Sequence, residues 1–394
     1  MRSKIKYSLI EILVAIFMFL LVRPSITWTW DVLFIHYGLL VLMAVQFDFN
    51  DKHNIPLFIF LFLSICIVPI AHDSNIIGVL ATAMMAFIPF ARKESSLRSF
   101  ELFKQIVVAV LTISIVVWFV VLVFQVPLPY SVIEPLNVHK DHYYQRYPFL
   151  VLPMDIKDFS VIRFCCVFDE AGVVGTMSLL FLYIGDFKLK RFDNIVFLVA
   201  GLISFSLFFY LGFVIFLLIK VFLNRELKRY RIASIVLVAG LFFTILTVPF
   251  LNDVVGYRFK FDEDKGTITG NNRSTDELDD YVASIRGTNL YYWGDPKGEE
   301  EFLASASLQN AVLRYGVVYL VLFFIFFFFY AQIRMHNNWK EIAMFMLLLI
   351  LTLFQRPGFL VPTYLYMFSS VVQSRQMVIE EKRLRSGGIS SQRV

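Results

Sequence analysis

The sequence predicts an all-α, polytopic integral membrane protein with about 12 transmembrane helices and two long loops on the outer face. Of its 394 residues, 58% are hydrophobic, 44 are Phe, and the mean hydropathy is +0.69. This composition is far more apolar than that of a water-soluble domain. Several windows also run for about 17 residues or more without a charge, which is the length of helix that crosses roughly 30 Å of hydrocarbon.

Apolar runs and the breaks between them define the individual segments. The first run follows a basic flank, as in a secretory signal, but no small-residue cleavage site follows it, so we interpret it as a retained span. No soluble domain of usual size remains between the runs, so we expect residues 1–394 to form a single membrane domain. The expected spans lie near residues 7–22, 28–47, 55–71, 75–90, 104–124, 171–185, 193–207, 208–223, 232–250, 306–330, 341–355 and 358–373.

The run over residues 193–223 is long enough to form one tilted helix. It is flanked by two basic stretches, "DFKLKRF" at 186–192 and "NRELKRYR" at 224–231, and both should remain in the cytoplasm. Two short spans, or a re-entrant hairpin that turns near "SFSLFFYLG" (204–212), satisfy this rule. Such short segments must pack inside the bundle.

Basic clusters predict the orientation of the chain. They occur at the N-terminus, between the fourth and fifth spans, between the tenth and eleventh spans (Arg334 and Lys340) and in a basic tail at 374–394. The positive-inside rule places all of these clusters, and with them both termini, in the cytoplasm. Two segments are left for the outer face: residues 125–170, in which four bases balance four acids before the acidic pair Asp169 and Glu170, and residues 252–305, which hold twelve acids and six bases. The net charge of +5 is therefore a surplus on the inner face, and it gives no reason to expect a nucleic acid partner.

Common catalytic motifs are absent. The sequence has no GxxxxGK[ST], GxGxxG, HExxH, CxxC or GxSxG pattern, which removes the usual nucleotide, zinc and serine-hydrolase sites. Cys66, Cys165 and Cys166 make neither a disulfide framework nor a metal-ligand spacing, so we expect small buried thiols. We expect no cofactor and no metal, although Asp262 and Asp264 leave a metal-binding pair open.

The stretch "RFCCVFDEAGVVGT" (163–176) places three charges beside an apolar run. Asp169 and Glu170 precede the sixth span, where acids cap a helix and complement its dipole. Arg163 lies seven residues before Glu170, so a helix that begins early would place the two on one face. The simpler role for Arg163 is interfacial snorkelling.

Small residues follow those acids, and they would let another helix or a ligand approach the backbone closely: Ala171, Gly172 and Gly175.

The later outer segments contain further candidates for binding an anionic lipid head group. Arginine binds phosphate bidentately and remains charged, which points to Arg258, Arg273 and Arg286, with a solvated loop surface as the alternative. Arg356 in "QRPGFLVP" lies at an outer helix boundary, where it must face protein, water or phosphate. Several aromatic residues would stack against sugar rings or lie at the membrane interface: Tyr281, Tyr291, Tyr292 and Trp293.

Together these motifs form a layout that resembles a known family. "IRFCCVFDEAGVVGT" resembles the R-F-x-x-x-F-x-E-P/A-G segment of bacterial membrane polysaccharide polymerases in the O-antigen ligase and polymerase superfamily. "FLVAGLISFSLFFYLGF" is similar to the serine-bearing pair of short spans that follows it there. The large outer loop, "SLQNAVLRYGVVYLVLFF" and "FQRPGF" complete the layout, which covers essentially the whole chain. The resemblance implies a GT-C-like helical bundle in the bacterial inner (plasma) membrane.

One departure distinguishes branches of the superfamily. O-antigen ligases resemble the pattern H-[NSQ]-x9-G-x-x-[GTY] at the span after the large loop. Counting back from Gly316, with Tyr319 at the last position, places Ser305 where the histidine should be, and Ala306 fails the second position. This difference favours the polymerase branch.

The resemblance implies that the chain joins undecaprenyl-pyrophosphate-linked oligosaccharide repeat units into O-antigen, capsule or exopolysaccharide at the outer face. A flippase and a chain-length regulator would be its partners in the bilayer. The growing chain would move to a hydroxyl of the new unit and release undecaprenyl pyrophosphate. Glu170, then Asp169, is the candidate base. The arginines expected to stabilise the pyrophosphate are Arg163, Arg258, Arg273 and Arg356, with Arg286 as a further contact.

Three alternatives remain. An O-antigen ligase would transfer finished polymer to lipid A core. A transporter or flippase of lipid-linked oligosaccharide would distribute polar residues through the depth of a cavity, whereas here they gather at one face. A structural membrane scaffold would use none of these residues chemically.

Overall fold

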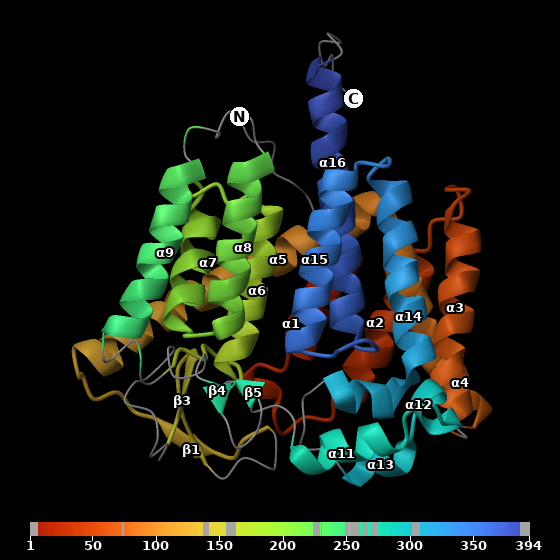
Figure 1. Cartoon of the computed structure of the whole chain (residues 1–394), viewed down its shortest axis with the longest axis horizontal. Coiled ribbons are helices and arrows are strands. Elements are labelled where there is room, and N and C mark those ends of the chain that lie inside the picture. Colours follow the sequence, from red (N-terminus) through yellow and green to blue (C-terminus); the bar gives the residue numbers. More distant parts are fainter. Residues whose placement is uncertain are drawn as a thin grey trace. The chain divides into compact units, whose positions relative to one another are not determined.

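In the computed structural model the chain is mostly helical (Figure 1), and every predicted span contains a helix within its described part. The helical class is therefore confirmed. Among the described residues, three helices are long and apolar enough to cross a membrane: Asn54–Ala71, Lys93–Val123 and Leu308–Arg334. The structure describes residues 7–72, 75–136, 142–154, 163–223, 229, 231–248, 252, 261–262, 267–268, 275–301 and 308–386.

The chain forms two compact units. The first unit comprises Met1–Val22, Asp31–Lys104 and Ser274–Val394, and the second comprises Arg23–Trp30 and Gln105–Arg273. Each unit is described by itself, and the predicted single membrane domain stays a prediction.

The first unit is built from apolar helices whose ends carry local stop and start signals. A capping box begins the first helix: Glu11 N donates to Ser8 Oγ at 3.3 Å, and Ser8 N donates to Glu11 Oε2 at 2.8 Å. Asn75 caps α4 through Gly78 N at 2.9 Å. The helices are α1 (Leu9–Leu21), α2 (Leu33–Val45), α3 (Asn54–Ala71), α4 (Ile76–Ala83), η2 (Met84–Phe90), the start of α5 (Lys93–Trp118), α11 (Asp276–Ser284), α12 (Asn289–Trp293), α13 (Pro296–Glu301), α14 (Leu308–Arg334), α15 (Trp339–Gln355) and α16 (Pro362–Ser386).

The Phe-rich run of α14 supplies the core of the first unit. Phe323, Phe326, Phe327 and Tyr330 are fully buried, and their spacing of three and four residues places them on one helix face. The Phe327 ring lies 6.0 Å from that of Phe345 on α15 and 5.8 Å from that of Phe368 on α16. Packing of these rings therefore holds the last three helices together.

The second unit combines helices with a small antiparallel sheet. Figure 1 shows α6, α7 and α8 side by side. The all-α prediction omitted the sheet, which lies in the first predicted outer segment and has the strand order β1-β2-β3. The helices are the end of α5, a π-helical turn at Phe119–Val123, α6 (Ala171–Ile184), α7 (Phe192–Ile203), α8 (Leu207–Leu223) and α9 (Arg231–Thr247), and the strands are β1 (Ser131–Ile133), β2 (Tyr144–Tyr147), β3 (Leu150–Pro153), β4 (Phe261–Asp262) and β5 (Thr267–Ile268).

The run over residues 193–223 is broken into two helices, as predicted. Helix α7 ends at Ile203 and α8 begins at Leu207. Phe205 between them has φ of 48°, a left-handed conformation that cannot continue a right-handed helix. The two short helices both pack on α6.

Candidate functional site

Arg163 lies against the end of α7. Its Nε donates to the carbonyl oxygen of Ser204 at 3.2 Å, and the next residue, Phe164, donates its backbone N–H to Ile203 O at 3.2 Å. These carbonyls belong to the last turn of α7, which has no intrahelical donors for them. A cation there also complements the negative end of the helix dipole. Arg163 is half-buried and does not lie on a helix. Helix α6 begins at Ala171, as the predicted span at 171–185 has it, so the early start that would place Arg163 and Glu170 on one helix face does not occur.

A buried turn connects Arg163 to the two acids. Phe168 N donates to Cys165 O at 3.0 Å, and Cys166 adopts φ of 57°. Val151 N on β3 donates to Cys166 O at 2.7 Å, which fixes the turn to the sheet. Both cysteines are buried thiols without a disulfide, as predicted, whereas Cys66 is only partly buried. Burial raises the pKa of the Cys166 thiol to about 12. The turn is a rigid support rather than a reactive centre.

Tyr144 positions the backbone of the first acid. Tyr144 lies on β2 and is buried, and its Oη donates to the backbone carbonyl oxygen of Asp169 at 2.6 Å. Trp28 packs edge-on against this ring at 5.3 Å. Burial, followed by the charge of Asp169, raises the pKa of Tyr144, so the phenol keeps its proton and acts as a donor. Tyr144 was not among the predicted site residues, although it lies in the aromatic run "HYYQRY" (142–147), which was the available signal.

Glu170 occupies the N-cap position of α6 with extended backbone (φ −144°, ψ 140°). Its side chain accepts no hydrogen bond from the first turn of the helix, so the expected side-chain cap is not formed. Both Glu170 and Asp169 are half-buried. The two acids therefore lie at the positive end of α6, and the Glu170 carboxylate does not cap the helix.

Gly175 brings α8 close to α6. A Cβ at this position would lie 2.5 Å from Ser206 Cβ and 2.6 Å from its Oγ, so only glycine permits this approach. The prediction that a small residue here admits a neighbouring helix is confirmed. Ser204 Oγ donates to Gly201 O at 2.7 Å and accepts from Ser206 N at 3.3 Å, which orders the turn between α7 and α8.

These residues form what we call the α6 junction: Arg163, Asp169, Glu170, Ser204 and Ser206. A guanidinium group, two carboxylates and the positive end of a helix belong to this one part of the second unit. Ser206 Oγ is buried and has no hydrogen-bond partner among the described residues. Such a set can bind a phosphate oxygen through the guanidinium and accept a proton on a carboxylate.

Two of the other predicted site residues are described in the first unit. Arg286 and Arg356 belong to the first unit: Arg286 is exposed after α11, and Arg356 is the half-buried C-cap of α15, where a cation complements the dipole. Five further residues named in the sequence analysis lie outside the described part of the chain: Arg258, Arg273, Ser305, Ala306 and Asp264. No group of three or more His, Cys, Asp or Glu within the described part could hold a metal ion.

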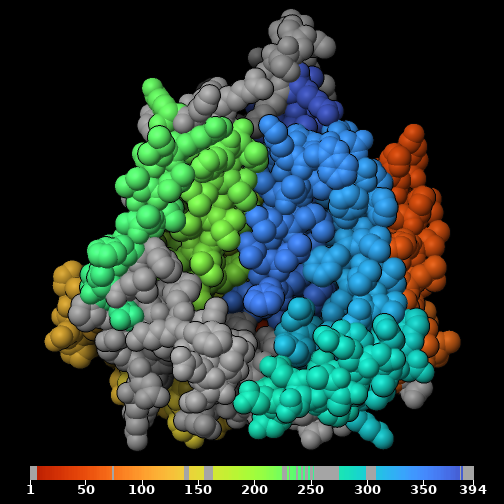
Figure 2. Space-filling view, in the orientation of Figure 1, coloured from red at the N-terminus to blue at the C-terminus, as the bar shows by residue number. Residues whose placement is uncertain are grey.

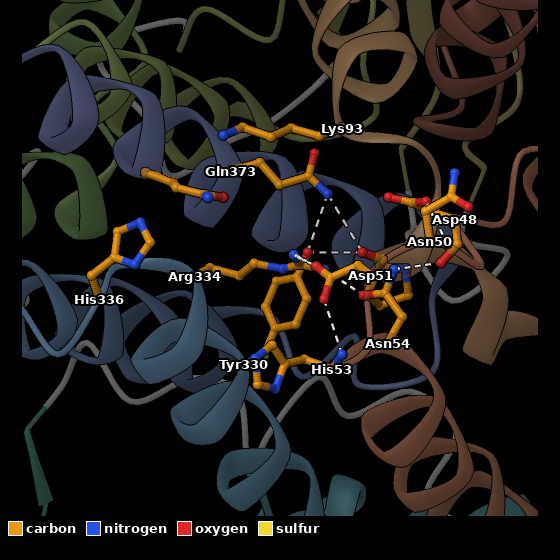
Figure 3. A network of polar contacts seen from close by, with 12 residues as sticks. Asp48, Asn50, Asp51, His53, Asn54, Lys93, Tyr330, Arg334, His336 and Gln373 are labelled. Atoms are coloured by element: carbon orange, nitrogen blue, oxygen red, sulfur yellow. Dashed lines mark hydrogen bonds and ion pairs between the residues drawn. The ribbon is translucent and has the colours of Figure 1, made fainter.

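A second polar cluster occurs in the first unit (Figure 3). Arg334 at the end of α14 pairs with Asp51 and donates to Asn54 Oδ1, and His53 N donates to Asp51 Oδ1 at 2.9 Å. Burial opposes ionisation of Asp51, but the His53 N–H and the Arg334 charge together lower its pKa.

Tyr330 and Gln373 extend this cluster to η2. Tyr330 Oη donates to Pro89 O at 2.8 Å and accepts from Gln373 Nε2 at 3.1 Å. These bonds join segments that are far apart in the chain, so we assign the cluster a structural role.

Comparison with protein-family models, with curated protein sequences and with solved structures finds no significant match to this chain.

Proposed function

We propose that the chain is a membrane polysaccharide polymerase that joins undecaprenyl-pyrophosphate-linked oligosaccharide repeat units at the outer face of the bacterial inner membrane. The observation that carries this proposal is the α6 junction, where Arg163 and two half-buried carboxylates belong to one ordered segment at the start of α6. Transfer from a pyrophosphate carrier requires both a cation for the leaving group and a base for the acceptor.

In the proposed reaction, a hydroxyl oxygen of the new repeat unit forms a bond to the anomeric carbon of the growing chain. The bond from that carbon to the pyrophosphate oxygen breaks, and undecaprenyl pyrophosphate leaves with the electron pair. Glu170 accepts the hydroxyl proton, with Asp169 as the second choice, and Arg163 binds the leaving phosphate. Four further arginines remain proposed phosphate contacts: Arg258, Arg273, Arg286 and Arg356.

The arrangement of the supporting residues fits this chemistry. Arg163 is held at Ser204 through one of its five N–H donors, which leaves the planar group in a defined orientation. Glu170 makes no side-chain cap to α6. The backbone that carries the acids is fixed by Tyr144 and by the buried Cys165–Phe168 turn. A site that must align two substrates benefits from such rigid support.

The test is deletion of the gene in its own cells, followed by complementation with the wild-type chain. We expect the deleted cells to carry single repeat units in place of long chains, and the wild-type chain to restore them. Polysaccharide gels measure length, and mass spectrometry of extracted lipids identifies what accumulates. Full-length polymer left on its carrier would indicate a ligase. Lipid-linked units that stay inaccessible to an impermeant outer-face probe would indicate a flippase.

A further inference from the structure

Residues 276–301 form a folded element in the first unit, which we call the outer cap because it lies in the second predicted outer segment. It consists of α11, α12 and α13, which all pack on α14. Leu278, Ile285 and Leu313 make a buried core beneath it. Figure 2 shows this element at the surface of the face in view.

The aromatic residues of the outer cap are of two kinds, those packed within the cap and those exposed at its surface. Tyr281 is an anchor: its hydroxyl donates to Asp295 Oδ2 at 2.6 Å, and the buried Asp295 donates its backbone N–H to Leu313 O on α14 at 2.6 Å. Tyr291 is a second anchor, packed on the core of Leu278 and Leu313. Both residues are only partly exposed and contribute to the packing of the cap.

Tyr292 and Trp293 are of the other kind, and we call them the aromatic ledge. Their side chains are 43% and 42% exposed. Their backbone is fixed against α14 at Gly316, where φ of 71° interrupts the helix. A Cβ at Gly316 would collide with Tyr292 O and would lie 2.5 Å from the carbonyl carbon of Trp293. The ledge is thus held by a contact that only glycine allows, so little backbone freedom is lost when it binds a ligand.

The charge of the outer cap selects among ligands for the ledge. Residues 276–301 contain eight acids and two bases, a net charge of −6. Apart from the local positive charge of Arg286, the proposed phosphate contact, such a surface disfavours anionic lipid head groups and phosphates at the ledge. This charge argues against a role as an interfacial anchor in an anionic leaflet. An uncharged ligand with apolar C–H faces and hydroxyl groups suits rings that have a polar O–H or N–H at one edge.

We infer that the aromatic ledge binds an uncharged stretch of oligosaccharide by stacking. The inference rests on the proposed function, in which the polymer emerges on this side of the membrane, and it makes the ledge a holding site for the growing chain. A chain that is held near the enzyme between additions is extended more often before release, because its effective local concentration is raised. The ledge would therefore influence polymer length rather than bond formation.

The test compares four variants in complemented cells and as full-length protein in nanodiscs. Tyr292→Ala/Trp293→Ala removes both rings, Trp293→Phe keeps a ring, Leu290→Ala alters an exposed residue of the same helix (43% exposed), and Arg163→Ala targets the α6 junction. We expect the double variant to join repeat units but to make shorter chains. Its affinity for oligosaccharides cut from the wild-type polymer should fall by about tenfold, while Trp293→Phe and Leu290→Ala stay close to wild type.

Each outcome decides between the alternatives. Wild-type chain lengths and unchanged oligosaccharide affinity in the double variant would overturn the ledge while leaving the polymerase intact. If cells lacking the chain make normal polymer, the proposed function fails and the ledge fails with it. Brominated lipids provide a further check. The fluorescence of Trp293 is the difference in emission between the wild type and Trp293→Phe, and brominated lipids should not quench it. Strong quenching would place the ledge in lipid and overturn the inference.

Discussion

The ε-nitrogen of Arg163 donates to the carbonyl oxygen of Ser204 at 3.2 Å, so one arginine both ends α7 and enters the α6 junction. This dual position matters for any experiment on Arg163, because a loss of activity has two physical explanations: a lost phosphate contact or a disordered turn between α7 and α8.

Substitutions of Arg163 separate these explanations. We expect Arg163→Ala to insert in the membrane but to leave cells with single repeat units. Arg163→Gln keeps an N–H donor for Ser204 and removes the charge, so it should retain the thermal stability of the wild type and still lose polymer, by about 100-fold or more in rate. Polysaccharide gels and detergent unfolding curves measure the two effects. Long chains from Arg163→Gln would remove the phosphate role.

Glu170 has a similar set of matched variants. Because its side chain does not cap α6, Glu170→Gln should change the free energy of unfolding by less than about 0.5 kcal/mol. Because Glu170 is the proposed base, Glu170→Gln should lower the rate of polymerisation by about 100-fold or more. Asn and Ala at this position complete the series. Activity in the Asn variant, whose amide cannot accept the proton, would show that Asp169 or another group is the base.

Gly175→Ala tests the close approach of α6 and α8. The added methyl would lie 2.5 Å from Ser206 Cβ, so we expect a loss of about 1–3 kcal/mol in the free energy of unfolding. Gly240→Ala on α9 is the matched control. A Cβ there meets nothing within 4 Å, and the change should stabilise its helix by up to about 1 kcal/mol. Denaturant titration in detergent compares the two; equal stabilities would refute the packing argument.

Asp51→Asn tests the ion pair with Arg334. The side chains are 24% and 14% exposed, so leaving the arginine without its partner should cost at least about 2 kcal/mol. Arg191→Gln, which breaks the exposed 2.6 Å pair with Asp193, should cost less than about 1 kcal/mol.

The Asp51 pair also predicts a dependence on pH. The pKa of the Asp51 carboxyl is lower in the folded chain than in the unfolded chain. The contribution of the pair to the free energy of unfolding is therefore complete above the unfolded pKa of about 4, and it is lost as the pH falls through the lower, folded pKa. The difference in unfolding free energy between wild type and Asp51→Asn should therefore shrink below about pH 4. A difference that is constant from pH 7 to pH 3 would contradict this assignment.

Local patterns in the sequence predicted much of the fold. Apolar runs predicted the helices, and the basic stretches on either side of residues 193–223 predicted the break that Phe205 makes. Hydrophobic period and charge are properties of neighbouring residues, and a single sequence displays them directly.

Long-range partners were not predictable in the same way. Asp51 and Arg334 are 283 residues apart, and nothing in either neighbourhood identifies the other. The sheet at 131–153 consists of strands of three or four residues, which are too short for a clear alternating pattern. In the candidate site, the sequence identified Arg163 and the two acids and placed the start of α6 correctly near residue 171, but it did not reveal the turn, fixed to the sheet, that precedes the helix.

Gly316 also divides α14 into two parts with different neighbours. Residues 308–315 precede the break and contact the outer cap through Leu313, whereas Phe323 and the residues beyond it pack among the apolar helices. Segments that share a core open together. Amide protons of residues 308–315 should therefore exchange with solvent deuterium at the rate of α11–α13, and those after Gly316 should exchange far more slowly, although both belong to one continuous helix by sequence.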